Sequence, residues 1–184
     1  LYNGSDDPAL NYSSAHRFLE MPINYMGYIV DYADVRSPLP ADVGRDRYAG
    51  VVSWFGGAIP DERFKDVRSW VVRQVQQGMP LLMMEAPGLP LDRTLATTLG
   101  VRSMEGAPTF PLKKAEQAPL MGFETEPGMP AHDYTGWLLT PQLQQQSRQL
   151  LSFDDAKGQR FVSAAITPWG GFVMTPYVLT DVPG

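Results

Sequence analysis

Residues Gly78–Gly88, GMPLLMMEAPG, indicate the fold class of this chain more clearly than any other stretch. Gly78 is typical of the residue that follows a helix, and Leu81–Met84 is a short apolar strand of the kind buried on both faces. The Pro87-Gly88 pair then predicts a sharp turn. Many α/β enzymes mount a nucleophile on such a strand and turn, but here the turn begins with Glu85. Glu85 is therefore either part of an active site or the mark of a missing one.

The segment before this stretch predicts a strand followed by an amphipathic helix. Tyr48–Phe55, YAGVVSWF, reads as a strand that ends at Gly56-Gly57. After Pro60, apolar residues recur at the three- and four-residue spacing of a helix face. These residues are Phe64, Val67, Val71 and Val75. We expect Asp61 to cap this helix and Gly78 to end it.

The N-terminal part of the chain predicts another strand, helix and strand. Leu1–Asn3 is expected to be the end of a first strand. A helix is expected to run from residues 13–14 to Gly27, with a kink at Pro22. Tyr28–Tyr32 has the alternating character of a second strand.

Pro90–Leu99 predicts one more helix, which Gly100 ends. Strand-like and helix-like runs therefore alternate as far as Val101, and this alternation is typical of a parallel sheet covered by helices. The predicted fold class is α/β, with a Rossmann-like or flavodoxin-like parallel sheet that has helices on both faces.

The pattern changes after Val101. Five prolines between Pro108 and Pro130 indicate loops and short strands, and the polar run Gln142–Gln149 is either a helical turn or an exposed linker. The last part predicts an antiparallel β meander with turns at residues 154–158 and 168–171. We therefore divide the chain into an α/β core, residues 1–104, and a region of Pro-rich loops and meander, residues 105–184. We expect the second region to pack on the first or to complete the same domain.

Composition excludes several functions. The chain has 184 residues, of which 43% are hydrophobic, and a net charge of −5 that offers no basic field for nucleic acid. No run approaches the roughly 18 to 20 apolar residues that span a bilayer, so no membrane insertion is expected. There is no cysteine, and the two histidines, His16 and His132, have no metal-ligand spacing. No nucleotide-binding glycine motif or nucleophile elbow is present, so neither a metal nor a cofactor is predicted.

Ligands of an open parallel sheet bind beyond the carboxyl ends of its strands. Three predicted loops follow such ends: Gly4–Asp7, Gly56–Pro60 and Glu85–Gly88. Their side chains are expected to face one crevice as candidate ligand-binding residues. The candidates are Ser5, Asp6, Trp54, Phe55, Gly57 and Glu85. The competing interpretation is ordinary turn chemistry, in which glycines supply positive φ and aspartates cap helices.

Two tryptophans are candidates for stacking on a sugar ring. Trp54 ends a predicted strand near the crevice, and Trp169 lies in the turn Pro168–Gly171, where exposure is expected. The alternative is that both rings pack in the core.

The order YAGVVSWFGG, helix, GMPLLMMEAPG resembles the core of the class I glutamine amidotransferase-like fold over about 40 residues. On that pattern Glu85 occupies the position of the nucleophilic cysteine. A carboxylate is a poor nucleophile for acyl transfer, and the family's downstream histidine and glutamate have no counterpart here. The resemblance therefore implies the geometry of the fold without its reaction.

A second resemblance covers most of the chain. The opening, residues 1–40, the run RYAGVVSWF and the run FVMTPYVL are similar to the region of PelA-type proteins between their glycoside hydrolase and polysaccharide deacetylase domains. PelA-type proteins act in the periplasm on the Pel exopolysaccharide of biofilms. No catalytic residue carries over, because the acidic residues of the hydrolase and the metal motif of the deacetylase belong to those other domains.

This resemblance implies a non-catalytic α/β domain of a periplasmic exopolysaccharide-modifying protein. Its expected partners are the flanking catalytic domains of the same chain, which it would position, and a polysaccharide, which it would help to hold. Two alternatives stay open at this point. One is a degenerate amidotransferase-like enzyme that uses Glu85 as acid or base, and the other is a glycan-binding module.

Overall fold

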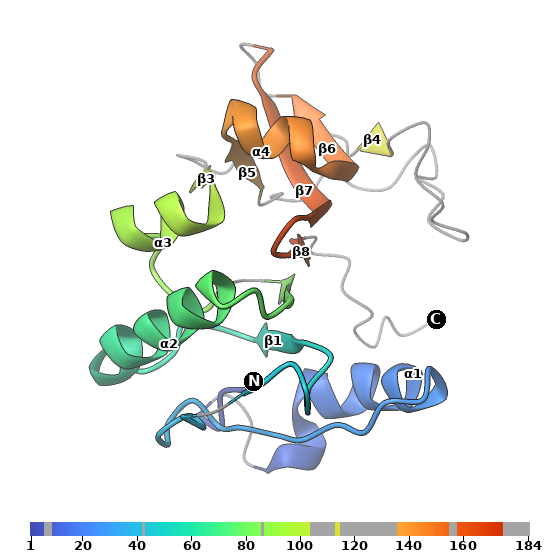
Figure 1. Cartoon of the computed structure of the whole chain (residues 1–184), viewed down its shortest axis with the longest axis vertical. Helices are drawn as coiled ribbons and strands as arrows, with labels where there is room; N and C mark the ends of the chain where they lie inside the picture. The colour runs from blue at the N-terminus through green and yellow to red at the C-terminus, as the bar shows by residue number, and fades with distance from the viewer. Residues whose placement is uncertain are drawn as a thin grey trace. The chain divides into compact units, whose positions relative to one another are not determined.

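A computed structural model describes residues 1–5, 9–41, 43–85, 87–103, 113–114, 136–154 and 158–174 of the chain. The described residues fall into two compact units that divide between Pro90 and Leu91 (Figure 1). The first unit combines parallel strands with helices, and the second combines an antiparallel sheet with two short helices. The prediction of a mixed α/β chain is confirmed. The boundary predicted at residue 104 stays a prediction.

Parallel backbone pairing organises the first unit. Strand β1 (Val51–Phe55) pairs in parallel with β2 (Leu81–Glu85), so that Phe55 lies opposite Glu85. On the other side of β1, Val52 and Trp54 exchange backbone hydrogen bonds with Leu1 in the pattern of a parallel bridge. Tyr2 in turn forms a parallel bridge with Asp34.

The first helix has the predicted extent. A 3₁₀ turn η1 (Leu10–Tyr12) leads into a π-helix η2 (Ala15–Leu19) and then α1 (Glu20–Tyr25). Pro22 has no N–H for the Phe18 carbonyl, and the wider π turns lie just before it. Gly27 follows the helix with φ of 90°.

The predicted strand Tyr28–Tyr32 is wrong, because these residues make no strand pairing, and the bridge comes later, at Asp34. Ile29 is 92% exposed, so the alternating pattern has no core to face. Two of its polar side chains bind elsewhere: Asp31 accepts a hydrogen bond from Tyr48, and Tyr32 donates one to Glu20.

The second helix is also confirmed, with a different start. A 3₁₀ turn η3 (Asp61–Arg63) precedes α2 (Phe64–Gln76), and Gly78 follows with φ of 78°. Among the described residues no side chain caps either start, so the cap expected from Asp61 is wrong. Arg63 instead donates to the carbonyls of Val35 and Ser37, both at 2.9 Å, which ties the helix start to the preceding loop.

In the second unit, α3 (Arg93–Leu99) is the helix predicted before Gly100. The Asp92 side chain caps it by accepting from Leu95 N at 2.9 Å, and Gly100 ends it in the left-handed conformation. Strand β3 (Val101–Ser103) follows and pairs antiparallel with β5 (Trp137–Leu139). The glutamine-rich segment then forms helix α4 (Pro141–Gln146).

The predicted antiparallel meander is confirmed in β6 (Arg148–Asp154), β7 (Arg160–Thr167) and β8 (Gly170–Val173), with the two-residue strand β4 (Lys113–Lys114) beside β6. Phe153 and Phe161 stack across β6 and β7 with centroids 5.5 Å apart and form a core with Leu151 and Ala164. The turn predicted at 168–171 joins β7 to β8. Residues 155–157 of the other predicted turn, and the Pro-rich segment 108–130 apart from β4, lie outside the described residues.

The bridge between Tyr2 and Asp34 is reinforced by the Asp34 side chain. Its carboxylate accepts backbone N–H groups of Gly4 at 3.2 Å and Arg36 at 3.0 Å, and it pairs with the Arg36 guanidinium at 2.7 Å. Burial acts to raise the pKa of Asp34, but these hydrogen bonds outweigh burial and hold the pKa below its usual value. The charged form therefore stabilises the fold.

We predict that Asp34→Asn lowers the free energy of unfolding at pH 7 by about 1 kcal/mol, because an amide accepts these hydrogen bonds more weakly. A carboxyl with a lowered pKa stabilises the fold above its unfolded pKa, and this contribution is lost as the pH falls through the folded value. Urea unfolding at pH 7 and near pH 3 should thus show the difference between wild type and variant shrinking in acid. Asp46→Asn, on an exposed aspartate, is the control. A pH-independent difference would contradict the assignment.

Candidate functional site

Glu85 occupies an unusual backbone conformation. It is the last residue of β2 and has φ of 65°, and no other non-glycine residue in the described part of the chain has positive φ. This conformation brings the Cβ of an L-residue too close to the following carbonyl oxygen and costs roughly 1 to 2 kcal/mol. Such strain persists only where surrounding contacts enforce it, and it is common at functional sites.

A buried indole fixes the Glu85 side chain. Trp54, which is 3% exposed, donates from Nε1 to Glu85 Oε2 at 2.8 Å. Phe18 packs against the Trp54 ring with centroids 5.9 Å apart. The carboxylate is thus half-buried and held at the carboxyl edge of β1 and β2. The structure brings together these two predicted site residues, which lie 31 positions apart in the sequence.

The turn after β2 closes tightly against β1. Gly88 has φ of 65°, and a Cβ placed on it would lie 2.3 Å from Phe55 Cδ2. Its carbonyl accepts from Ile59 N at 3.0 Å, which joins this turn to the loop after β1. Phe55 is 2% exposed, so it forms the floor of this edge and does not present a ring to a ligand.

Asn3 joins the first loop to the same edge, and sequence reasoning did not single it out. It is 1% exposed, its Nδ2 donates to the Ala58 carbonyl at 3.3 Å, and its Oδ1 accepts from Ser5 N at 3.1 Å. The loops that carry Ser5 and Gly57 therefore meet through Asn3. The sequence signal that could have identified Asn3 is its position directly before Gly4, at the end of the first predicted strand. Asp6 lies outside the described residues.

Trp169 does not belong to this site. It lies in the second unit, is 8% exposed and donates from Nε1 to the Leu99 carbonyl at 3.0 Å. Its ring stacks at 6.2 Å from Phe172. The expected exposure is wrong, because the turn folds its indole into the core, where the N–H finds an acceptor. Neither Trp54 nor Trp169 offers a face for stacking on a sugar.

A second polar cluster, also not anticipated, lies on the first helix. His16 Nδ1 and Tyr32 Oη both contact Glu20 Oε2, the tyrosine as a donor at 2.8 Å. Burial raises the pKa of Tyr32, and the hydrogen bond and charge of Glu20 raise it further. The four-residue spacing of His16 and Glu20 was visible in the sequence, but the position of Tyr32 was not. Within the described residues no three metal-ligating side chains converge, here or elsewhere.

A groove of about 350 Å³ lies along α2. It is lined by Pro38, Leu39, Arg63, Asp66, Ser69, Trp70 and Arg73. Three of its polar side chains have partners within the fold: Trp70 Nε1 donates to the Pro40 carbonyl, Ser69 Oγ donates to the Lys65 carbonyl and Arg63 pairs with Asp66, each at 2.7 Å. None of the predicted site residues lines this groove.

Comparison with known proteins adds no further assignment. The chain matches no protein-family model and no curated protein. In the described ranges, no helix combines the length and apolar character that crossing a membrane requires. The geometry of the Glu85 edge is therefore the main evidence on function. It provides a fixed carboxylate acceptor at the ends of parallel strands, without an ion-pair partner among the described residues.

We predict that variants at Glu85 separate backbone strain from hydrogen bonding. Glu85→Ala should destabilise the chain by about 1 to 3 kcal/mol, because the buried Trp54 N–H loses its acceptor while φ stays positive. Glu85→Gly loses the same acceptor but relieves the strain, and should be more stable than Glu85→Ala by about 1 kcal/mol. Glu85→Gln keeps an acceptor and should be closest to wild type. Urea unfolding followed by tryptophan fluorescence measures all three.

The matched control is Glu62, an exposed residue of η3. There the backbone is helical, so Ala should be more stable than Gly, the reverse of the order at Glu85. A double-mutant cycle of Glu85→Ala with Trp54→Phe should give a coupling of about 1 kcal/mol. The same Ala-over-Gly order at both positions would contradict strain at Glu85.

Proposed function

We propose that this chain is a non-catalytic α/β domain of a periplasmic, PelA-type exopolysaccharide-modifying protein. In this proposal it positions the flanking catalytic domains of the same chain or helps to hold their glycan. The similarity of residues 1–40, RYAGVVSWF and FVMTPYVL to that family suggests the assignment. The observation that carries the non-catalytic role is the Trp54–Glu85 hydrogen bond, in which the carboxylate at the nucleophile position serves a buried indole.

We further infer a flavodoxin-like arrangement of the first unit. The backbone bridges place residues 33–35 beside 1–3, then β1, then β2. In order along the chain this is 2-1-3-4, the beginning of the flavodoxin-like strand order. This order supports the predicted parallel sheet with helices on both faces. It also supports the resemblance to amidotransferase-like folds, in which a strand and turn like β2 and Glu85–Gly88 carry the nucleophile.

The loss of the amidotransferase reaction follows from the chemistry of the residue. Acyl transfer needs a nucleophile activated by a neighbouring base. Glu85 is a weak nucleophile, and its Oε2 already accepts the Trp54 N–H. The turn thus keeps the backbone geometry of a nucleophile site while its side chain serves the internal packing of the unit.

One observation favours a different function. Positive φ at a non-glycine residue is typical of catalytic turns, and Glu85 is half-buried at the ligand-binding edge of parallel strands. The second candidate is therefore an enzyme in which Glu85 acts as general acid or base. If the chain is such an enzyme, its activity depends on the ionisable Glu85 carboxyl. The non-catalytic domain has no activity that could depend on it.

We predict no turnover of partly acetylated chito-oligosaccharides by the chain, measured as released reducing ends and released acetate. Glu85→Gln and the control Glu62→Gln should both behave as wild type. Turnover that Glu85→Gln abolishes and Glu62→Gln preserves would overturn the non-catalytic role and favour the enzyme. Titration of the same sugars against tryptophan fluorescence separates glycan holding from domain positioning, because only the former predicts saturable binding.

A further inference from the structure

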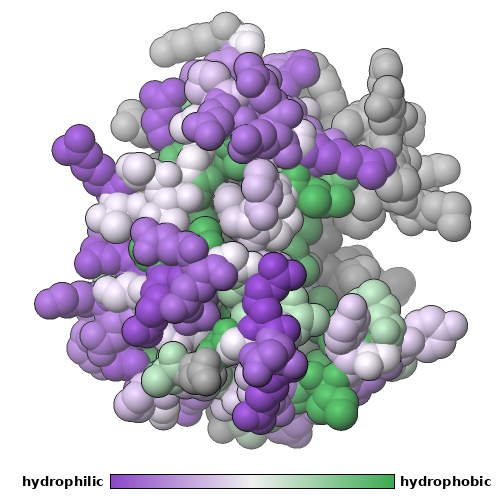
Figure 2. Space-filling view, viewed as in Figure 1, coloured by the Kyte–Doolittle hydropathy of each residue, from purple (hydrophilic) through white to green (hydrophobic). Residues whose placement is uncertain are grey.

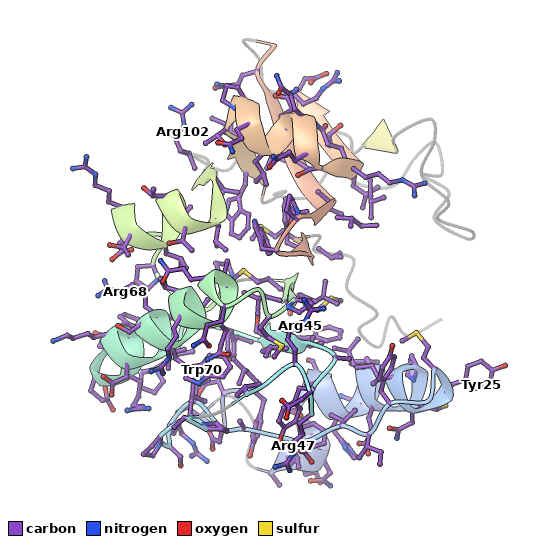
Figure 3. The ribbon with its side chains drawn as sticks, viewed as in Figure 1. Tyr25, Arg45, Arg47, Arg68, Trp70 and Arg102 are labelled. Atoms are coloured by element: carbon purple, nitrogen blue, oxygen red, sulfur yellow. The ribbon has the colours of Figure 1, made fainter. Side chains whose placement is uncertain are left out.

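The end of helix α1 and the segment after it form an unusual surface. Residues 21–29 read MPINYMGYI and contain no charged side chain. Five large side chains of this run are exposed, and we call them the α1-end surface. They are Met21 (77% exposed), Tyr25 (93%), Met26 (64%), Tyr28 (52%) and Ile29 (92%). Figure 3 shows Tyr25 projecting from the helix end into open space, and Figure 2 shows pale and green atoms over this part of the chain.

The summed exposed area of the five residues of the α1-end surface is larger than that of a typical apolar surface patch. At about 200 Å² for a large side chain, these exposed fractions amount to roughly 700 to 800 Å². The largest apolar patch on a monomer is typically about 300 to 600 Å². One side of a standard protein–protein interface buries about 800 Å². A partner that covered all five side chains would thus bury about as much area as one half of a standard interface.

Backbone hydrogen bonds hold this surface in place. Met26 N donates to the Ile23 and Pro22 carbonyls, and Tyr28 N donates to the Ile23 carbonyl at 3.2 Å. Gly27 makes the reversal with φ of 90°. The exposed side chains therefore project from a closed helix end with satisfied donors. A surface fixed in this way loses little backbone entropy on association.

The charges at the rim are paired within the chain. Glu20 contacts His16 and Tyr32, and Asp31 accepts from Tyr48 at 2.9 Å and lies 3.6 Å from Arg47. A partner with a charged surface would therefore meet charges, at Glu20 and Asp31, that already have partners within the chain. A lipid surface is also disfavoured, because interfacial helices carry several Lys and Arg on their own polar face, and residues 18–30 contain neither. Two identical uncharged surfaces, in contrast, meet without repulsion between unpaired charges.

We propose that the α1-end surface is a self-association interface, and that two copies of this chain join through it about a two-fold axis. Tyr and Met are enriched at interface centres, where charged residues are depleted. The buried total of roughly 1,500 Å² is that of a standard interface. The contact is isologous, so each copy contributes the same residues.

The test is sedimentation velocity of the chain from about 1 to 200 µM, a range that spans dissociation constants of a weak dimer. We expect a monomer–dimer equilibrium within this range. Tyr25→Asp with Ile29→Asp should weaken it at least about tenfold, because each copy then places two carboxylates at the centre of the contact. Both positions are more than 90% exposed, so the folded chain should tolerate the changes.

Ile166→Asp is the matched control, since Ile166 is a 52% exposed apolar residue on β7, outside the α1-end surface. It should leave the equilibrium unchanged. Circular dichroism and thermal unfolding confirm that each variant folds. A chain that stays monomeric throughout the range overturns the proposal. So does a dimer that the double variant leaves intact, or one that Ile166→Asp disrupts equally.

Discussion

The parallel register of β1 and β2 is the constraint on which the candidate site depends. Parallel strands run in the same direction, so their carboxyl ends, and the loops after them, meet at one edge. The pairing of Val51 with Leu81 through Phe55 with Glu85 fixes this edge to the residue. A slip of one residue would send every side chain of β2 to the opposite face and would take the buried Leu81 and Met83 out of the core. The buried residues Met83 and Leu81 hold the register from within.

Much of this edge was predictable because it follows from local rules. The glycines at 78, 88 and 100 all have positive φ, as turn and helix-end glycines do. The apolar run before Glu85 correctly predicted strand β2. The fate of the tryptophans was not predictable. Whether an indole at a strand end or in a turn is exposed depends on what packs over it, and the Phe18 ring that packs on Trp54 comes from a distant position. The hydrogen-bond acceptors of these indoles are equally remote in sequence.

The errors at Tyr28–Tyr32 and Asp61 have one physical origin. In both places a local preference was overridden by a long-range contact. The alternating run found no core to face, and its polar groups bind Glu20 and other residues outside it. Asp61 does not cap the helix. Instead, Arg63 anchors the helix start by donating to two carbonyls 26 and 28 residues away. Alternation predicts a strand only when one of its two faces is buried.

The strain at Glu85 can be weighed against the bond that it makes possible. Positive φ costs roughly 1 to 2 kcal/mol. A buried indole N–H without an acceptor costs about 1 to 3 kcal/mol. These magnitudes are similar, so the Trp54–Glu85 hydrogen bond is sufficient to maintain a glutamate where glycine would be unstrained. Strain at this turn therefore does not by itself require catalysis. The strain has an internal explanation, because the hydrogen bond from Trp54 on β1 holds the Glu85 side chain at the end of β2. In this interpretation the Glu85 carboxylate has a structural role.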